Sequence, residues 1–116
     1  MAAPNIVNVS KITGKTAVVT LNSTSAIDIV ENPALSGQVF KINSLYAANI
    51  DGVNACNISI TVDSKKIAHT ISVPADSTLV VVSKDASIYL EENKKIIATA
   101  GAANGIDIIC SYEEIS

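Results

Sequence analysis

The residues that could carry out chemistry are few, and their spacing argues against a catalytic centre. His69 is the only histidine, so a Ser-His-Asp triad or a histidine-based metal site would have to be built around it. It alternates with Ile67, Ile71 and Val73, which is where a partly buried structural imidazole would lie. No nucleophile elbow or matched pair of carboxylates accompanies it. We predict that the chain is not an enzyme, and a pH-sensitive subunit contact is the one special role expected for His69.

One short segment resembles the end of a phosphate-binding loop. Gly14, Lys15 and Thr16 have the right order, but the motif also needs a glycine where Val9 stands. Without that glycine the backbone amides cannot curl around phosphates. We therefore expect a plain turn at Gly14 and Lys15, and no nucleotide cofactor.

Metal-binding patterns are also missing from the sequence. Cys56 and Cys110 are too far apart for a zinc or redox pair, so two reduced core thiols are the favoured interpretation. A disulfide between the two cysteines is the alternative interpretation if their strands are neighbours. Glu91–Glu92 and Glu113–Glu114 are adjacent pairs, and adjacent residues of a strand point to opposite faces. We expect solvated strand ends there, and no metal or other cofactor.

Composition restricts the partners that the chain can have. Its 116 residues suit one domain, 1–116, and the side chains are 48% hydrophobic but only 3% aromatic. There is no Trp or Arg, and the net charge is −3, with lysines and carboxylates interspersed. Direct binding to nucleic acid or to a membrane is therefore not expected. The start lacks the features of a signal peptide, so we expect a soluble protein made in the cytoplasm.

Alternation of apolar and polar residues indicates an all-β fold. From Ala55 to Glu114, short runs with a spacing of two are separated by turn residues, which predicts hairpins over 54–73, 78–91 and 95–113. The whole chain should form a single antiparallel β-sandwich, jelly-roll-like, with about eight to ten short strands. The predicted inward face comprises Ile58, Ile60, Val62, Ile71, Val80, Val82, Ile88, Leu90, Ile97, Ile108 and Cys110.

The N-terminal segment, residues 1–13, has two interpretations. Ile6, Val7, Val9 and Ile12 are its apolar residues, set among Asn and Ser without a clear hairpin partner. They could form the first strand of the sandwich, or an extended arm that pairs with a neighbouring subunit or a larger assembly. These four residues are the predicted contacts of the chain.

Several strings of residues resemble a family of small virion structural proteins of tailed phages, especially phages that infect marine cyanobacteria and similar hosts. The strings are distributed along nearly the whole chain: Ala2–Val9, Val39–Tyr46, Asn49–Gly52, Ile71–Asp85, Ile88–Glu92 and Cys110–Ser116. The last two contain the distinctive sequences YLEE and SYEEIS. This resemblance implies a protein of the phage particle.

Within that family, a capsid decoration or cement protein is the first hypothesis. It would bind the assembled head in many copies, with the major capsid protein or other virion proteins as partners. We expect a homo-oligomer, with a trimer favoured, because a cyclic cluster hides exposed strand edges. A tail, neck or fibre component, such as an adaptor or ring protein, is the alternative. A carbohydrate-binding module is a remote third, disfavoured by the small number of aromatic residues.

Overall fold

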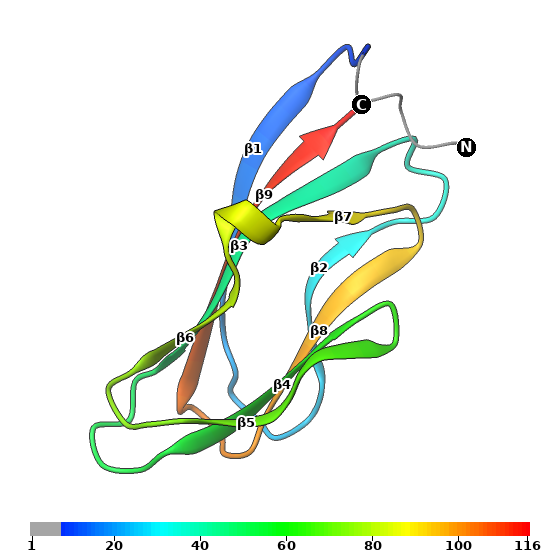
Figure 1. Cartoon of the computed structure of the whole chain (residues 1–116). Helices are drawn as coiled ribbons and strands as arrows, with labels where there is room; N and C mark the ends of the chain where they lie inside the picture. The colour runs from blue at the N-terminus through cyan, green and yellow to red at the C-terminus, as the bar shows by residue number, and fades with distance from the viewer. Residues whose placement is uncertain (1–7) are drawn as a thin grey trace.

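Two antiparallel β-sheets make up the structure, a computed structural model that describes residues 8–116 (Figure 1). These residues contain nine strands and one short 3-10 helix. The elements are β1 (Ile12–Thr20), β2 (Ile27–Asn32), β3 (Val39–Asn49), β4 (Cys56–Val62), β5 (Lys65–Val73), β6 (Thr78–Val82), η1 (Lys84–Ala86), β7 (Ile88–Leu90), β8 (Lys94–Ala100) and β9 (Ile106–Ile115). The predicted all-β class is confirmed.

The order of the strands is that of a jelly roll. One sheet has the order β1-β9-β3-β6, with β7 also paired to β3, and the other has the order β2-β8-β4-β5. Strands β6 and β7 pair with successive parts of β3, so they act as one edge strand that η1 interrupts. Counted this way, eight strands wind through two four-stranded sheets, as in the jelly rolls of viral capsids and lectins. The predicted sandwich is therefore a jelly roll.

Two of the three predicted hairpins are wrong. The hairpin over 54–73 is present as β4 and β5. The segment 78–91 forms no hairpin, because β6 and β7 pair with β3 and not with each other. The segment 95–113 crosses between the sheets, since β8 pairs with β2 and β4 while β9 pairs with β1 and β3. Alternation identifies strands, but it does not identify their partners.

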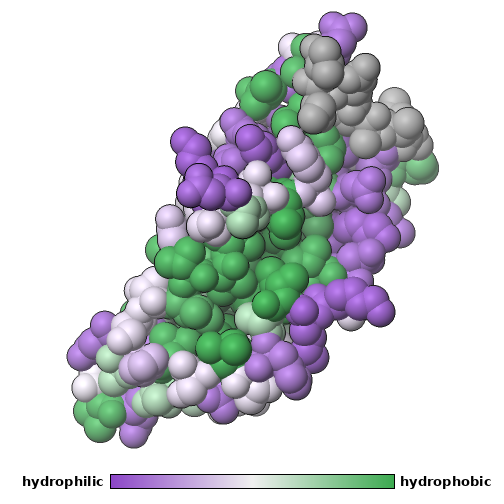
Figure 2. Space-filling model, in the orientation of Figure 1, coloured by the Kyte–Doolittle hydropathy of each residue, from purple (hydrophilic) through white to green (hydrophobic). Residues whose placement is uncertain are grey.

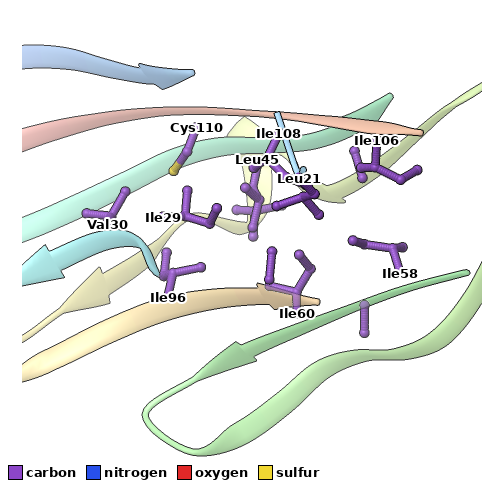
Figure 3. Close-up of a cluster of buried hydrophobic side chains, with 14 of the residues drawn as sticks. Leu21, Ile29, Val30, Leu45, Ile58, Ile60, Ile96, Ile106, Ile108 and Cys110 are labelled. Carbon is purple, nitrogen blue, oxygen red and sulfur yellow. The ribbon is translucent and has the colours of Figure 1, made fainter. Parts of the chain in front are cut away.

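Aliphatic side chains from both sheets fill the space between them. Figure 3 shows Leu45, Ile108 and Cys110 from one sheet near Ile60 and Ile96 from the other, and all five are fully buried. The predicted inward face is confirmed for six buried residues: Ile58, Ile60, Val82, Leu90, Ile108 and Cys110. Two more predicted residues, Val62 and Ile88, pack partly buried against this core.

Three residues of the predicted inward face are not in the core. Val80 pairs with Tyr46 on the outer face of its sheet and is exposed, because a bulge between Val80 and Val82 reverses the alternation. Ile97 is half-buried and pairs with Thr61 on an outer face. Ile71 faces inward, opposite Ile58, but it lies on the edge strand β5 and remains 40% exposed.

Strand β5 bends away from a regular alternation. Its register with β4 shifts twice, between Ile58 and Ile60 and again between Ile60 and Thr61. Thr70 adopts a positive φ of 51°, and its backbone N–H donates to the Ser59 hydroxyl at 2.9 Å. Each inserted residue moves the following side chains to the other face. Ile67 is exposed for this reason, although its spacing predicted burial.

Two buried asparagines fasten loops to the ends of strands. The Asn49 amide donates to the backbone carbonyls of Asn54 and Val73, at 3.0 and 2.9 Å, and its Oδ1 accepts the Asp51 N–H at 2.9 Å. Asn32 is fully buried and donates to the carbonyl of Leu90 at 3.0 Å. Burial of an amide is stabilising only when it is bonded in this way, so both loops are held firmly.

Candidate interaction surface

The segment that resembles a phosphate-binding loop is part of a regular strand. Gly14, Lys15 and Thr16 lie in the middle of β1, in unbroken register with Glu113, Tyr112 and Ser111 of β9. An extended, paired backbone cannot curl around phosphates. The predicted turn at Gly14 and Lys15 is therefore wrong, because both residues are paired within β1.

His69 has no buried environment. It is exposed on β5, next to the displaced residue Thr70, and its Nδ1 lies 3.4 Å from the Thr70 hydroxyl. The prediction that the His69 imidazole is partly buried is therefore wrong, because the bulge that exposes Ile67 also exposes His69.

The two cysteines lie in different sheets and are both free. Cys56 is on β4 and Cys110 is on β9, and both side chains are buried. Burial raises the pKa of the Cys110 thiol to about 12, so this side chain is a neutral part of the core. Across residues 8–116, no three His, Cys, Asp or Glu side chains come close enough to hold a metal ion.

Glu113 and Glu114 divide between the two faces of β9, as predicted, whereas Glu91 and Glu92 follow the end of β7 and lie on no strand. Glu114 turns to the inner face, where its Oε1 lies 3.2 Å from Lys15 Nζ. Glu113 lines a hollow on the outer face of the same sheet. Glu92 accepts the backbone N–H of Gly37 at 3.2 Å, which attaches the loop before β3 to the segment after β7. None of these contacts brings two carboxylates together.

Four large apolar side chains form a line across the outer face of the five-stranded sheet. Val18 of β1 pairs with Ile109 of β9, Ile109 pairs with Tyr46 of β3, and Tyr46 pairs with Val80 of β6. Their exposed fractions are 70%, 37%, 37% and 52% in that order. We call these four residues the apolar row. Exposed apolar groups that adjoin across four strands are typical of a contact surface.

A polar hollow adjoins the apolar row at Tyr46. It has a volume of about 400 Å³ and is lined by Lys41, Asn43, Ser44, Tyr46, Lys84, Ser111 and Glu113. The register between β3 and β9 shifts between Ile42 and Ser44, which leaves Asn43 as an inserted residue at this point. Bulges commonly redirect side chains in this way next to functional surfaces. The hollow combines an aromatic ring with hydroxyl, amide and charged groups.

Apolar surface also lies on one open side of the sandwich. Figure 2 shows it in the middle of the molecule, in the region where Figure 1 places the gap between β6 of one sheet and β5 of the other. The strands around this gap contribute Ile71 of β5, which is 40% exposed, and the half-buried Leu79 and Val81 of β6. Neither edge strand is covered there by another strand of residues 8–116.

The predicted contact residues are only partly described. Ile6 and Val7 lie outside the described residues. Val9 is half-buried, and Ile12 is 55% exposed as the first residue of β1. The backbone N–H groups of Ser10 and Lys11 both donate to the Ser116 carbonyl, at 2.8 and 3.0 Å, so the start of the described chain lies beside its end.

Sequence reasoning missed the apolar row. Its members are outward residues on four strands that are far apart in the sequence, so only the register brings them together. One signal was available at Ile109, which interrupts the alternation by following Ile108 directly. Apolar residues on both faces of a strand indicate contacts on both faces.

Comparison with known proteins finds likeness at the level of the fold. No protein-family model and no curated protein matches the chain. A solved chain from the acidic stable capsid of Helicobacter pylori bacteriophage KHP30 is similar, with a TM-score of 0.57 and 9% identity over 94% of this chain and 90% of that chain. A chain from the disulfide-linked pili of Bacillus endospore appendages has a TM-score of 0.45 and 16% identity, over 90% of this chain and 88% of that one. In the described residues no helix is long and apolar enough to span a membrane. A jelly roll of this size and outline thus also occurs in a phage capsid.

Proposed function

We propose that this chain is a structural protein of a phage virion, and specifically a decoration protein that binds the assembled head in many copies. The observation that carries the proposal is the likeness in fold to a phage capsid chain over almost the full length of both chains. The resemblance of several strings, such as Cys110–Ser116, to small phage virion proteins supports the same class. The comparisons do not support a particular host. A phage of marine cyanobacteria is proposed from the resemblance of these strings alone.

Exposed apolar surface supports an assembled state. The apolar row and the open side near Ile71 lie on different parts of the molecule, so one subunit can contact more than one neighbour. The chain has no Trp or Arg, the residues that dominate tight pairwise interfaces. Contacts of modest strength repeated over many copies are sufficient for a protein that binds only an assembled lattice.

Copy number on the particle separates the proposal from its alternative. A head decoration protein should be present in hundreds of copies, whereas a neck, tail or fibre component should be present in roughly a dozen, as cyclic closure requires. Quantitative mass spectrometry of purified virions measures this ratio against the major capsid protein, the expected partner. Antibody labelling of intact virions gives the location. Hundreds of copies on the head support decoration, and a label confined to the tail contradicts it.

The polar hollow favours one second candidate, the binding of carbohydrate. Tyr46 lines the hollow together with the hydroxyl residues Ser44 and Ser111 and the amide residue Asn43, a combination of side chains that suits a sugar ring. A glycan array probed with the wild-type chain and with Tyr46→Ala tests it. Binding that the substitution abolishes supports the candidate. An array with no signal above background removes it and leaves the structural role unaffected.

A further inference from the structure

Among the sheet edges of residues 8–116, β1 is the one without a device against pairing. The opposite edge of its sheet, β6 and β7, is interrupted by η1 and by a bulge against β3. In the other sheet, β2 is bulged between Asp28 and Val30, and β5 is bulged twice. Bulges and interruptions are how natural sheets stop edge-to-edge association. All nine residues of β1 pair with β9 without any shift.

The hydrogen bonds of β1 show which groups face the open edge. Lys11 and Ser116 exchange both of their backbone bonds, at 3.0 and 2.9 Å, and the Leu21 N–H donates to the Ile106 carbonyl at 2.9 Å. In an antiparallel ladder such pairs alternate with pairs whose groups point away. The odd-numbered residues of β1 are therefore bonded to β9. The N–H and C=O groups of the even-numbered residues point to the open edge: Ile12, Gly14, Thr16, Val18 and Thr20.

Charge does not protect this edge either. Lys15 is the only charged residue of β1, and its ammonium is held on the inner face by Glu114 at 3.2 Å. The side chains of the even-numbered residues lie on the outer face, and none of them is charged. Val18 is the most exposed member of the apolar row. An edge with free backbone groups and apolar flanks is a ready template for another strand.

We propose that β1 pairs antiparallel with β1 of a second copy of this chain, about a two-fold axis at Thr16. This is the register that uses all five outward-facing residues, because Thr16 then meets Thr16, Val18 meets Gly14, and Ile12 meets Thr20 of the other copy. The two five-stranded sheets become one continuous sheet.

The register is also self-complementary in shape. A side chain built on Gly14 would meet nothing within 4 Å, so open space lies over this residue. Val18 of the second copy fills that space and loses its exposure to water. The partner must be the same strand, because the other described edges are bulged. Pairing of one surface with itself gives a two-fold dimer, which replaces the trimer expected from the sequence.

A cysteine at the axis tests the register directly. Paired residues that exchange both hydrogen bonds have Cα atoms about 5.5 Å apart, within the range of a disulfide. Thr16→Cys should therefore form a covalent dimer when glutathione disulfide is added, which is reduced to two thiols as the bridge forms. Val18→Cys is the matched control, since the two Val18 residues lie about 13 Å apart along the strands. Equal cross-linking of both variants, or none with Thr16→Cys, overturns the proposal.

Charged substitutions of Thr16 test the two-fold axis in a second way. The Thr16 side chain is exposed and its backbone groups point outward, so Thr16→Lys and Thr16→Glu should fold as the wild type does, as circular dichroism can verify. Each should be monomeric by itself, because like charges meet at the axis. An equimolar mixture should restore a dimer of twice the 12.0 kDa chain mass in sedimentation velocity. A mixture that stays monomeric contradicts the axis.

These measurements use the isolated chain and no phage particle. A wild-type chain that is monomeric at about 0.1 mM, a concentration at which a contact of even micromolar affinity would form, contradicts the proposal, and so does a trimeric mass. Neither result bears on whether the chain decorates a head. Copy number on virions tests that function separately.

Discussion

At the scale of single residues, Ile60 and Val80 are the most informative comparison. Both are aliphatic strand residues that the sequence predicts to face inward, yet Ile60 is fully buried and Val80 is 52% exposed on an outer face. Ile60→Asp should unfold the domain, because it buries an unpaired charge at a cost of about 4 kcal/mol or more. Val80→Asp should cost no more than about 1 kcal/mol, the range of strand propensities. Thermal unfolding followed by circular dichroism measures both.

Equal melting temperatures for Ile60→Asp and the wild type would show that the assigned core is wrong. A Val80→Asp chain as unstable as Ile60→Asp would instead place Val80 inside the sandwich. The stability of the Val80→Asp chain also bears on the apolar row, since Val80 can contribute to a contact surface only from the outer face.

Cys110 makes the stability depend on alkaline pH. Burial raises the pKa of its thiol from the ordinary 9.0 to about 12, so between these values the unfolded chain loses a proton that the folded chain keeps. The unfolded state then binds fewer protons, and the free energy of unfolding falls as the pH rises above about 9. Cys110→Ala should weaken this decline between pH 9 and 11 in urea titrations. Identical slopes for both chains would contradict the assignment.

At the scale of elements, the sequence predicted strands well and their partners poorly. Alternation located β4 and β9 closely, because both run through the sandwich with one face in the core. It failed at β5, where inserted residues reverse the face of Ile67, and it gave no guidance at β6, where residues 79–82 are all aliphatic and an inserted residue leaves Val80 on the outer face. A bulge of this kind depends on the partner strand and leaves little trace in composition. The crossing from β8 to β9 and the apolar row also depend on which strands are partners, so the sequence did not predict them.

The N-terminal segment gives a prediction at this scale. A chain that begins at Thr13 loses the three backbone bonds of Ser10 and Lys11 with Ser116, which lie at one end of β1 and β9. It keeps the paired residues from Thr13 to Thr20 and the whole core, so we expect it to fold with a lowered melting temperature. We expect it to lose binding to virions, because the predicted contacts Ile6, Val7, Val9 and Ile12 are removed.

A chain that begins at Asn8 is the matched control, since it keeps the bonds to Ser116 and lacks Ile6 and Val7. Binding to virions is measured by co-sedimentation. Loss of binding in both chains assigns the contact to Ile6 and Val7, and loss in the shorter chain alone assigns it to Val9 and Ile12. Failure of the Thr13 chain to fold would mean that the segment belongs to its own core and is no arm.

At the scale of the whole molecule, the jelly roll separates the surfaces that different neighbours could use. The β1 edge, the outer-face residues Ile109, Tyr46 and Val80, and the open side near β5 are separate surfaces, and Val18 alone belongs to both the apolar row and the β1 edge. A subunit can therefore pair with a copy through β1 while another surface contacts a shell. Such double attachment converts a weak contact into firm binding, because the second contact forms at a high effective concentration.

Binding to the head should therefore be cooperative. Titration of virions lacking the chain with the wild type should give a binding curve steeper than a simple hyperbola, because each bound copy offers its β1 edge to one second copy, with which it forms the two-fold dimer. Thr16→Lys should bind along a hyperbola, with an affinity lower by a factor of about 100 or more, since it keeps the shell contact and loses the contact between copies. The temperature at which heated particles release DNA should rise with occupancy. Superimposable curves for the two chains would mean that copies bind the shell independently of one another.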